Sequence, residues 1–187
     1  ASWRGEAGDA AGAADAFADL LADRIRVLGE DHPDTLTTRN NLASWRGEAG
    51  DAAGAADAFA DLLADRIRVL GEDHPDTLTA RGNLATWRGE AGDAAGAADA
   101  YEQLHTARQR LMGENHPTTF AACGSFAHWR GQAGDAAGAV TVSEQLLEHM
   151  VRVLGVDHPH VAVIRNNLAH WRKEAQGAPG GSGLNRS

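Results

Sequence analysis

The sequence predicts an all-α protein, an α-solenoid built from antiparallel helix pairs. Two observations carry this prediction. Tryptophan returns every 42 residues, at Trp3, Trp45, Trp87, Trp129 and Trp171. A His-Pro pair returns with the same period, beginning at His32, His74, His116 and His158. A fixed period of roughly 20 to 50 residues is typical of proteins in which one helical or strand unit is stacked repeatedly and buries its apolar face on its neighbours.

The repeats fill most of the chain. The first 42 residues and the next 42 differ only where Thr38 and Asn40 become Ala80 and Gly82. Recent duplication and a repetitive ligand would both account for this near-identity. We predict a solenoid over residues 1–175, made of about four units and a terminal helix, with residues 1–7 as the end of its first helix. Residues 176–187, rich in Gly and Ser, are expected to form a flexible tail.

Each unit should begin its longer helix after a Gly-Asp pair such as Gly50-Asp51. Gly can end the preceding helix, and Asp can accept the backbone N–H groups that open the next one. From Ala55 to Leu70 the apolar residues fall at spacings of three and four or their multiples. This spacing predicts an amphipathic helix of about five to six turns.

A short Gly-to-Pro segment should connect each longer helix to the next, shorter one. Gly71 suits the end of a helix, and Pro75 suits a first turn, where its missing N–H costs nothing. Asp76 complements the positive end of the helix dipole. The shorter helix then ends near Gly89. We therefore expect every unit to contain two antiparallel helices, the first short and the second long.

Two features are expected to shape the packing. Gly returns inside each longer helix, at Gly12, Gly54, Gly96 and Gly138. Because Gly inside a helix costs about 0.5–1 kcal/mol relative to Ala, its return predicts a close approach of two helix backbones. The fourth unit has Ser143 where the others have Phe17, Phe59 and Tyr101, and it contains the poor helix-forming run Cys123-Gly124-Ser125. We expect it to be the least regular pair.

Composition excludes several classes of partner. The formal net charge is −9, with 26 acidic and 17 basic residues, and Lys and Arg do not cluster. Nucleic acid and anionic membrane surfaces are therefore not expected partners. No apolar run is long enough for a membrane span. The single Cys123 fits a reducing, cytoplasmic compartment. The absence of an initiator Met suggests a piece of a larger protein.

The units resemble tetratricopeptide repeats of the 42-residue, kinesin-light-chain-like type. The resemblance rests on Leu-Gly-Glu-Asp-His-Pro-Asp-Thr-Leu over 70–78, Asn-Asn-Leu-Ala over 40–43, the turn at Gly50-Asp51, Ala55 and Phe59. It implies a right-handed superhelix that binds proteins or peptides. The residue choice, rich in Ala, Gly, Asp and Arg, is similar to that of bacterial repeat proteins, in which such arrays often follow a nucleotide-binding domain.

The resemblance also implies that the first helix of each pair lines a peptide-binding groove. Carried over by position, the groove would contain Thr37, Asn40, Asn41, Ser44, Thr79, Asn83, Thr86, Ala121, Ser125, His128, Asn166, Asn167 and His170. Asn offers a donor and an acceptor, so a row of Asn can hydrogen-bond a peptide backbone. The alternative is that Asn41, Asn83 and Asn167 satisfy neighbouring helix ends.

Other recurring residues have competing interpretations. Arg39, Arg81 and Arg165 could clamp a ligand carboxylate or pair with nearby acidic residues. The histidines of successive His-Pro turns are too far apart to share a metal ion, so no metal site is expected. The tryptophans are expected in the core between helices. No catalytic constellation recurs, which predicts a protein that is not an enzyme and needs no cofactor.

The sequence thus predicts a non-catalytic scaffold that binds a protein or peptide of unknown identity. A second hypothesis is a structural module that associates end to end, giving a homo-oligomer through the solenoid ends. Solenoids without polar capping helices expose apolar surface that favours such association.

Overall fold

The computed structural model describes residues 10–177, and within this range the chain forms eight α-helices and no strand. The helices are α2 (Ala10–Leu28), α3 (Pro33–Glu48), α4 (Ala52–Leu70), α5 (Pro75–Glu90), α6 (Ala94–Met112), α7 (Pro117–Gln132), α8 (Ala136–Leu154) and α9 (Pro159–Gly177). The predicted all-α solenoid is confirmed. The predicted helix end over 1–7, and all but the first two residues of the predicted tail, lie outside the described residues.

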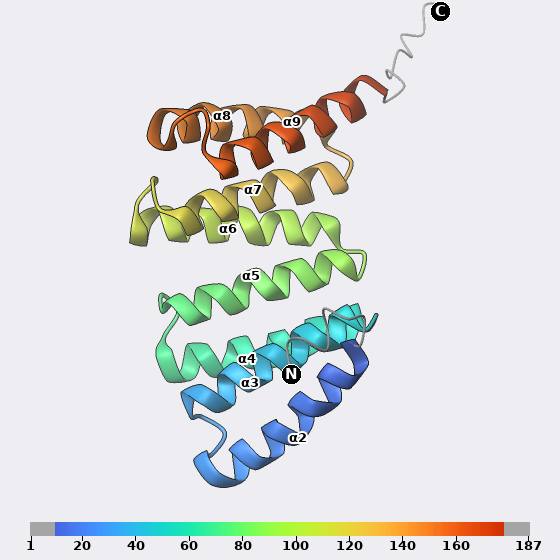
Figure 1. Ribbon diagram of the computed structural model, residues 1–187, viewed down its shortest axis with the longest axis vertical. Helices are drawn as coiled ribbons and strands as arrows, with labels where there is room; N and C mark the ends of the chain where they lie inside the picture. The colour runs from blue at the N-terminus through green and yellow to red at the C-terminus, as the bar shows by residue number, and fades with distance from the viewer. Residues whose placement is uncertain (1–9, 178–187) are drawn as a thin grey trace, which may run out of the picture.

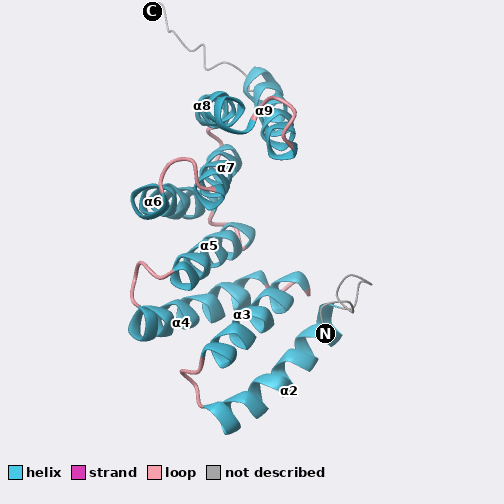
Figure 2. Cartoon of the chain, turned by 60° about the vertical axis from the view of Figure 1, so that its left-hand side comes forward, coloured by secondary structure: helices cyan, strands magenta, loops and turns pink. Residues whose placement is uncertain are grey.

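Consecutive helices stack along the long axis of the molecule, from α2 at one end to α9 at the other (Figure 1). Each helix packs mainly on its neighbours in the chain. In Figure 2, α4, α6 and α8 lie on one side of the stack, and α5, α7 and α9 lie on the other. The helices that follow the His-Pro pairs, which are the first helices of the units, also meet directly, because α3 contacts α5 and α7 contacts α9. The surface shared by these first helices is where the sequence predicts a groove.

The predicted turns are confirmed, with one role that the sequence did not indicate. The Asp51 side chain accepts a hydrogen bond from the Gly54 N–H, and Gly71 has a φ of +88°. His74 is the N-cap of α5, because its Nδ1 accepts from the Asp76 N–H at 3.1 Å. The same cap opens α3, α7 and α9. The His of the His-Pro pair therefore satisfies an otherwise unpaired helix N–H.

The explanation predicted for the helical glycines is wrong. A Cβ on Gly54 would lie 2.1 Å from the carboxylate of Asp51, and Gly96 and Gly138 meet their own capping Asp in the same way. Gly is required at these three positions because the capping carboxylate folds back over the first turn. It does not mark a crossing of two helices.

The close approach between units occurs at a different set of glycines, near the end of each shorter helix. A Cβ on Gly47 would lie 2.3 Å from the ring of Trp87 in the next unit. The pairs Gly89 with Trp129 and Gly131 with Trp171 repeat this contact at 2.4 and 2.5 Å. Each of these indole rings therefore lies against the backbone of the preceding short helix, which confirms these tryptophans as core residues.

The fourth unit is as regular as the others, contrary to prediction. Its helices α7 and α8 have 16 and 19 residues, like α5 and α6, and α7 continues unbroken through Gly124. Ser143 is buried in the position that Phe59 holds in α4. The unusual residues of this unit change the side chains that its helices present, and the helical backbones of α7 and α8 stay regular. Within the described residues, no helix is long and apolar enough to cross a membrane.

Candidate functional site

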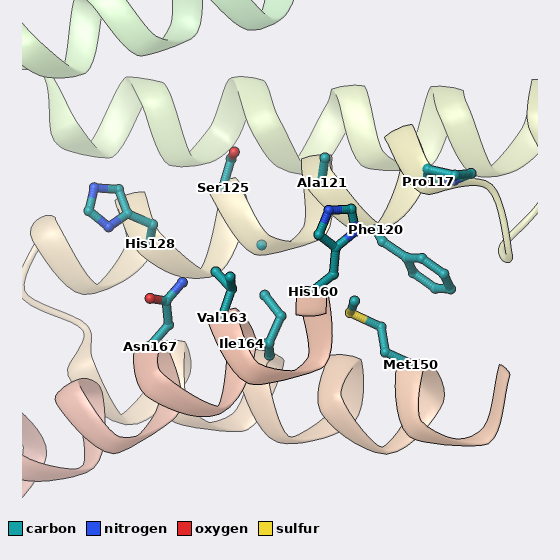
Figure 3. Close-up of a pocket in the computed structure, with 11 residues that line it drawn as sticks. Pro117, Phe120, Ala121, Ser125, His128, Met150, His160, Val163, Ile164 and Asn167 are labelled. Carbon is teal, nitrogen blue, oxygen red and sulfur yellow. The ribbon is translucent and has the colours of Figure 1, made fainter. Parts of the chain in front are cut away.

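A pocket of about 370 Å³ opens between α7 and α9. From α7 it is lined by Pro117, Phe120, Ala121, Gly124, Ser125 and His128. Met150 comes from α8, and His160, Val163, Ile164 and Asn167 come from α9. Figure 3 shows the side chains of α9 rising toward α7, with Met150 and Phe120 approaching one another at one end. The pocket lies on the predicted groove surface and is mostly apolar.

Met150 forms part of the apolar floor of this pocket. It stands 42 residues after Arg108, at a position that the earlier longer helices fill with Arg. Arg66, which is buried, donates from Nη1 to the carbonyl of Asp76 at 2.7 Å, and Arg24 and Arg108 make the equivalent bond. In the fourth unit a buried thioether replaces the buried guanidinium. The charge and the hydrogen bond are both lost, and apolar surface takes their place.

The loss of an asparagine opens the pocket further. Between α3 and α5, the Asn83 amide donates to Oδ1 of Asn40 at 3.1 Å and links the two helices. At the equivalent positions of α7 and α9 stand Gly124 and Asn167, so this bond cannot form. Within the described residues, the Asn167 side chain has no hydrogen-bond partner, and it lines the pocket. Its donor and acceptor are therefore both available to a ligand.

The pocket wall contains no carboxylate, Lys or Arg side chain. At one end His128 lies edge-on to Trp129, with ring centroids 5.1 Å apart, and near Trp171. The pKa of His128 is lowered, mainly because partial burial disfavours the charged ring and secondarily because His170 is close, although Glu90 opposes the shift. A neutral imidazole offers one donor and one acceptor at this end of the pocket.

The predicted groove residues fall into three groups. Ser125, His128 and Asn167 line the pocket together with Ala121. Others are engaged within the chain: Asn40 with Asn83, Thr86 with the Tyr101 hydroxyl at 2.7 Å, and Thr37 and Thr79 with the carbonyls of Pro33 and Pro75 at 2.9 Å. Asn41 and Ser44 are half-buried, and Asn166 and His170 are exposed. The Asn83 bond to Asn40 differs from the helix-end role considered as an alternative.

The three arginines considered as a carboxylate clamp differ in their surroundings. Arg39 pairs with Asp65 at 2.6 Å, and Arg81 pairs with Glu72 at 3.4 Å. Arg165 is exposed on α9 and forms no ion pair within the described residues. Two of the three positions therefore already hold a carboxylate from the chain itself.

The metal-ligating and nucleophilic side chains of the described residues are dispersed or protonated. Over residues 10–177, no three His, Cys, Asp or Glu side chains gather closely enough to hold a metal ion. Burial raises the pKa of the Cys123 thiol to about 11, so the thiol stays protonated at neutral pH and is a poor nucleophile.

The fold and its groove define a helical-repeat protein of the α-solenoid class. The family model of the tetratricopeptide repeat matches residues 5–34, 35–76 and 77–118, and the chain belongs to this family. The repeats of this family generally mediate protein–protein interaction. The matched residues end at 118, so all but one of the pocket-lining residues lie beyond them.

Solved structures share this architecture. A putative kinesin light chain from Podosopora anserina with nearly identical TPR-like repeats superimposes with a TM-score of 0.82 at 20% identity, covering 94% of this chain and 83% of that one. BtubC (BKLC) from P. vanneervenii gives a TM-score of 0.75 at 20% identity, covering 92% and 69%. These likenesses establish the fold. Among curated protein sequences, none matches the chain.

Proposed function

We propose that this chain is a non-catalytic scaffold that binds a protein segment along the surface formed by α3, α5, α7 and α9. The observation that carries the proposal is the apolar pocket between α7 and α9, which opens on that surface. An exposed concave apolar site with a few polar groups at its edge is the usual form of a binding site. The single cysteine and the Ala- and Arg-rich composition support a cytoplasmic, bacterial setting.

Asparagines at one equivalent position support an extended ligand. Asn41, Asn83 and Asn167 recur on α3, α5 and α9, and Ser125 holds the position on α7. Amides spaced along a groove can bond successive peptide groups of a ligand backbone. Of the three, Asn83 already has a partner within the chain, so Asn41 and Asn167 would contribute most.

A selection experiment tests this function. The purified chain is immobilised and used to enrich binders from a phage-displayed library of random dodecapeptides. Enriched peptides are synthesised and titrated by fluorescence anisotropy. The triple variant Asn41→Ala, Asn83→Ala, Asn167→Ala should bind them more weakly while keeping its helical circular dichroism spectrum. The matched control replaces Asp57, Asp61 and Asp99, which are exposed on the longer helices, with Ala and should bind as the wild-type chain does.

Failure of the library to yield any enriched peptide would contradict the proposed function. The proposed function would also be contradicted if the three Asp→Ala substitutions weakened peptide binding and the three Asn→Ala substitutions did not. The binding surface would then lie on the longer helices.

End-to-end association is a second candidate, and the comparison of α2 with α4 favours it. The two helices have the same sequence, yet Leu20 of α2 is 38% exposed and its equivalent Leu62 is fully buried. In α4 the residue packs in one cluster with Leu36 of α3. Sedimentation equilibrium over a range of concentrations tests this candidate. Association that Leu20→Glu abolishes would support it, and a monomer at every concentration would exclude it.

A further inference from the structure

We infer that the partner segment inserts an aliphatic or aromatic side chain into the pocket between α7 and α9, and that this apolar anchor selects the partner. The inference rests on the proposed peptide-binding function and adds the chemistry of the ligand. It is carried by a comparison of equivalent positions within this one chain.

The size of the pocket fits a single anchor. Ligand pockets in proteins span about 300–1,000 Å³, and at about 370 Å³ this one lies near the small end of that range. A whole peptide would not fit inside it. One large side chain could enter while the peptide backbone stayed on the groove surface between the two helices.

The floor of the pocket is apolar and fixed in place. Met150, Phe120 and Ile164 are 1%, 6% and 9% exposed, and they belong to one buried cluster with Val161 and Leu146. Packed side chains of this kind give a preformed surface, so a ligand would not need to reorganise it.

The rim contains apolar surface that the repeat elsewhere does not have. Val163 is 54% exposed at the position where α3 and α5 have Thr37 and Thr79, and Ala121 holds it in α7. Contact with an apolar ligand would remove the Val163 side chain from water, which favours binding in proportion to the apolar area buried. Contact with a polar ligand would give no such gain.

Charge separates this site from the equivalent one between α3 and α5. There, Arg66 and Asp76 stand at the positions of Met150 and His160. An apolar side chain placed against that site would strip water from the exposed Asp76 carboxylate, which is costly. The α7–α9 pocket has neither group, so an apolar side chain can enter it without this cost.

Asn167 adds a means of holding the ligand backbone beside the anchor. It lines the pocket with both amide functions unpaired within the described residues. One N–H and one carbonyl of the partner backbone can satisfy it. The pocket would then bind the anchor side chain, and Asn167 would hydrogen-bond the backbone of the same ligand segment.

A substitution taken from the chain itself tests this inference. Met150→Arg restores the residue that three earlier helices hold, and the carbonyl of His160 is in the place of the acceptor that Arg66 uses. The variant should therefore fold, and its long charged side chain should fill the pocket floor. The affinity of a library-selected peptide should fall at least about tenfold, which corresponds to about 1.4 kcal/mol. Val163→Thr, which restores the residue of α3 and α5, provides a second variant of smaller volume change in case Met150→Arg does not fold.

The peptides supply the other half of the test. Aligned selected sequences should share one apolar residue, and its replacement by Ser should weaken binding to the wild-type chain. The same replacement should have little further effect on binding to Met150→Arg, because the two changes remove one contact.

Three outcomes would overturn the inference. The first is a set of selected peptides that share no apolar residue, and the second is binding to both variants as tight as to the wild-type chain. In either case the scaffold function would stand and the anchor would not. Self-association of the free chain that Met150→Arg abolishes would instead identify a second copy as the occupant. Failure of the selection itself would count against the proposed function on which the inference rests.

Discussion

The junction of α3 with α5 and the junction of α7 with α9 are built on the same backbone plan but present opposite chemistry. The first is polar: Asn83 bonds Asn40, and Arg66 reaches the carbonyl of Asp76. The second places Gly124 and Met150 at the positions of Asn40 and Arg66 and opens an apolar pocket. A few side-chain replacements, with α7 the same length as α3, accompany the change from a closed structural contact to a candidate binding site.

This difference separates residues that hold the solenoid together from residues that are free to bind. The Trp-on-Gly contact, the Asp and His caps and the short Gly turns occur at both junctions. They belong to the framework. The residues that differ between the junctions decide whether the contact is closed by hydrogen bonds or left open, and the following predictions test this division.

The largest expected effect is on the shared Trp-on-Gly contact. Gly47→Ala at the first junction and Gly131→Ala at the second should each destabilise the chain by about 1–3 kcal/mol, because the added methyl overlaps an indole ring that would have to shift. Guanidinium denaturation followed by far-UV circular dichroism measures the change. Gly124→Ala, in the same helix as Gly131, is the control.

That control should change stability in the opposite direction. A Cβ on Gly124 would lie 3.4 Å from Cδ1 of Ile164, which is close to ordinary contact. Replacing Gly by Ala inside a helix should then stabilise the chain by up to about 1 kcal/mol through helix propensity. If Gly124→Ala and Gly131→Ala changed the free energy of unfolding by the same amount, the division between framework residues and pocket residues would be contradicted.

A smaller effect should separate two asparagines at equivalent positions. Asn83→Ala breaks the bond to Asn40 and should cost about 0.5–1.5 kcal/mol of stability. Asn167→Ala removes no bond within the described residues and should change stability by less than about 0.5 kcal/mol. The same denaturation experiment measures both. Loss of stability in Asn167→Ala that matches Asn83→Ala would mean that Asn167 belongs to the framework.

The smallest effect concerns the Asp caps, which both junctions share. Hydrogen bonding from the Gly54 N–H, and secondarily pairing with Arg46, hold the pKa of Asp51 below its ordinary value. Because the folded-state pKa is the lower one, the carboxylate stabilises the fold above the unfolded pKa of about 4. That contribution is lost as pH falls through the folded pKa.

Asp51→Asn keeps an oxygen acceptor for the cap and removes the titrating charge. The thermal midpoint of the wild-type chain should therefore exceed that of the variant at neutral pH, and the gap should narrow below about pH 4. Asp135→Asn should behave in the same way, because Gly138 and Arg130 lower the pKa of Asp135 through the same contacts. A gap that stays constant with pH would contradict the role assigned to these carboxylates.

The period and the turn residues were sufficient to predict the solenoid, its helix lengths and the position of its turns. They were not sufficient to explain each glycine. Gly54 is required by a carboxylate three residues earlier, whereas Gly47 is required by Trp87, which lies 40 residues later and comes close only when two units stack. A contact between units depends on a packing geometry that local propensity does not contain.

Some pocket-lining residues could have been found from the sequence, but the family resemblance does not select them. Carrying the groove over by position selects Asn167 and Ser125, but it passes over Met150, Val163 and Gly124. Those residues stand out only when equivalent positions are compared along the chain, because Met150 and Val163 replace the Arg and Thr of earlier units and Gly124 replaces the Asn40 of the first. Whether such losses merge into one cavity depends on how α7, α8 and α9 pack.

One measurement compares the two junctions directly. Thr37, Thr79, Ala121 and Val163 hold one equivalent position on α3, α5, α7 and α9, and each has a methyl group visible by NMR. Addition of a library-selected peptide should shift the methyl signals of Val163 and Ala121 strongly and those of Thr37 weakly. Shifts confined to Thr37 and Thr79, with Val163 unmoved, would contradict the claim that the pocket between α7 and α9 is where the partner binds.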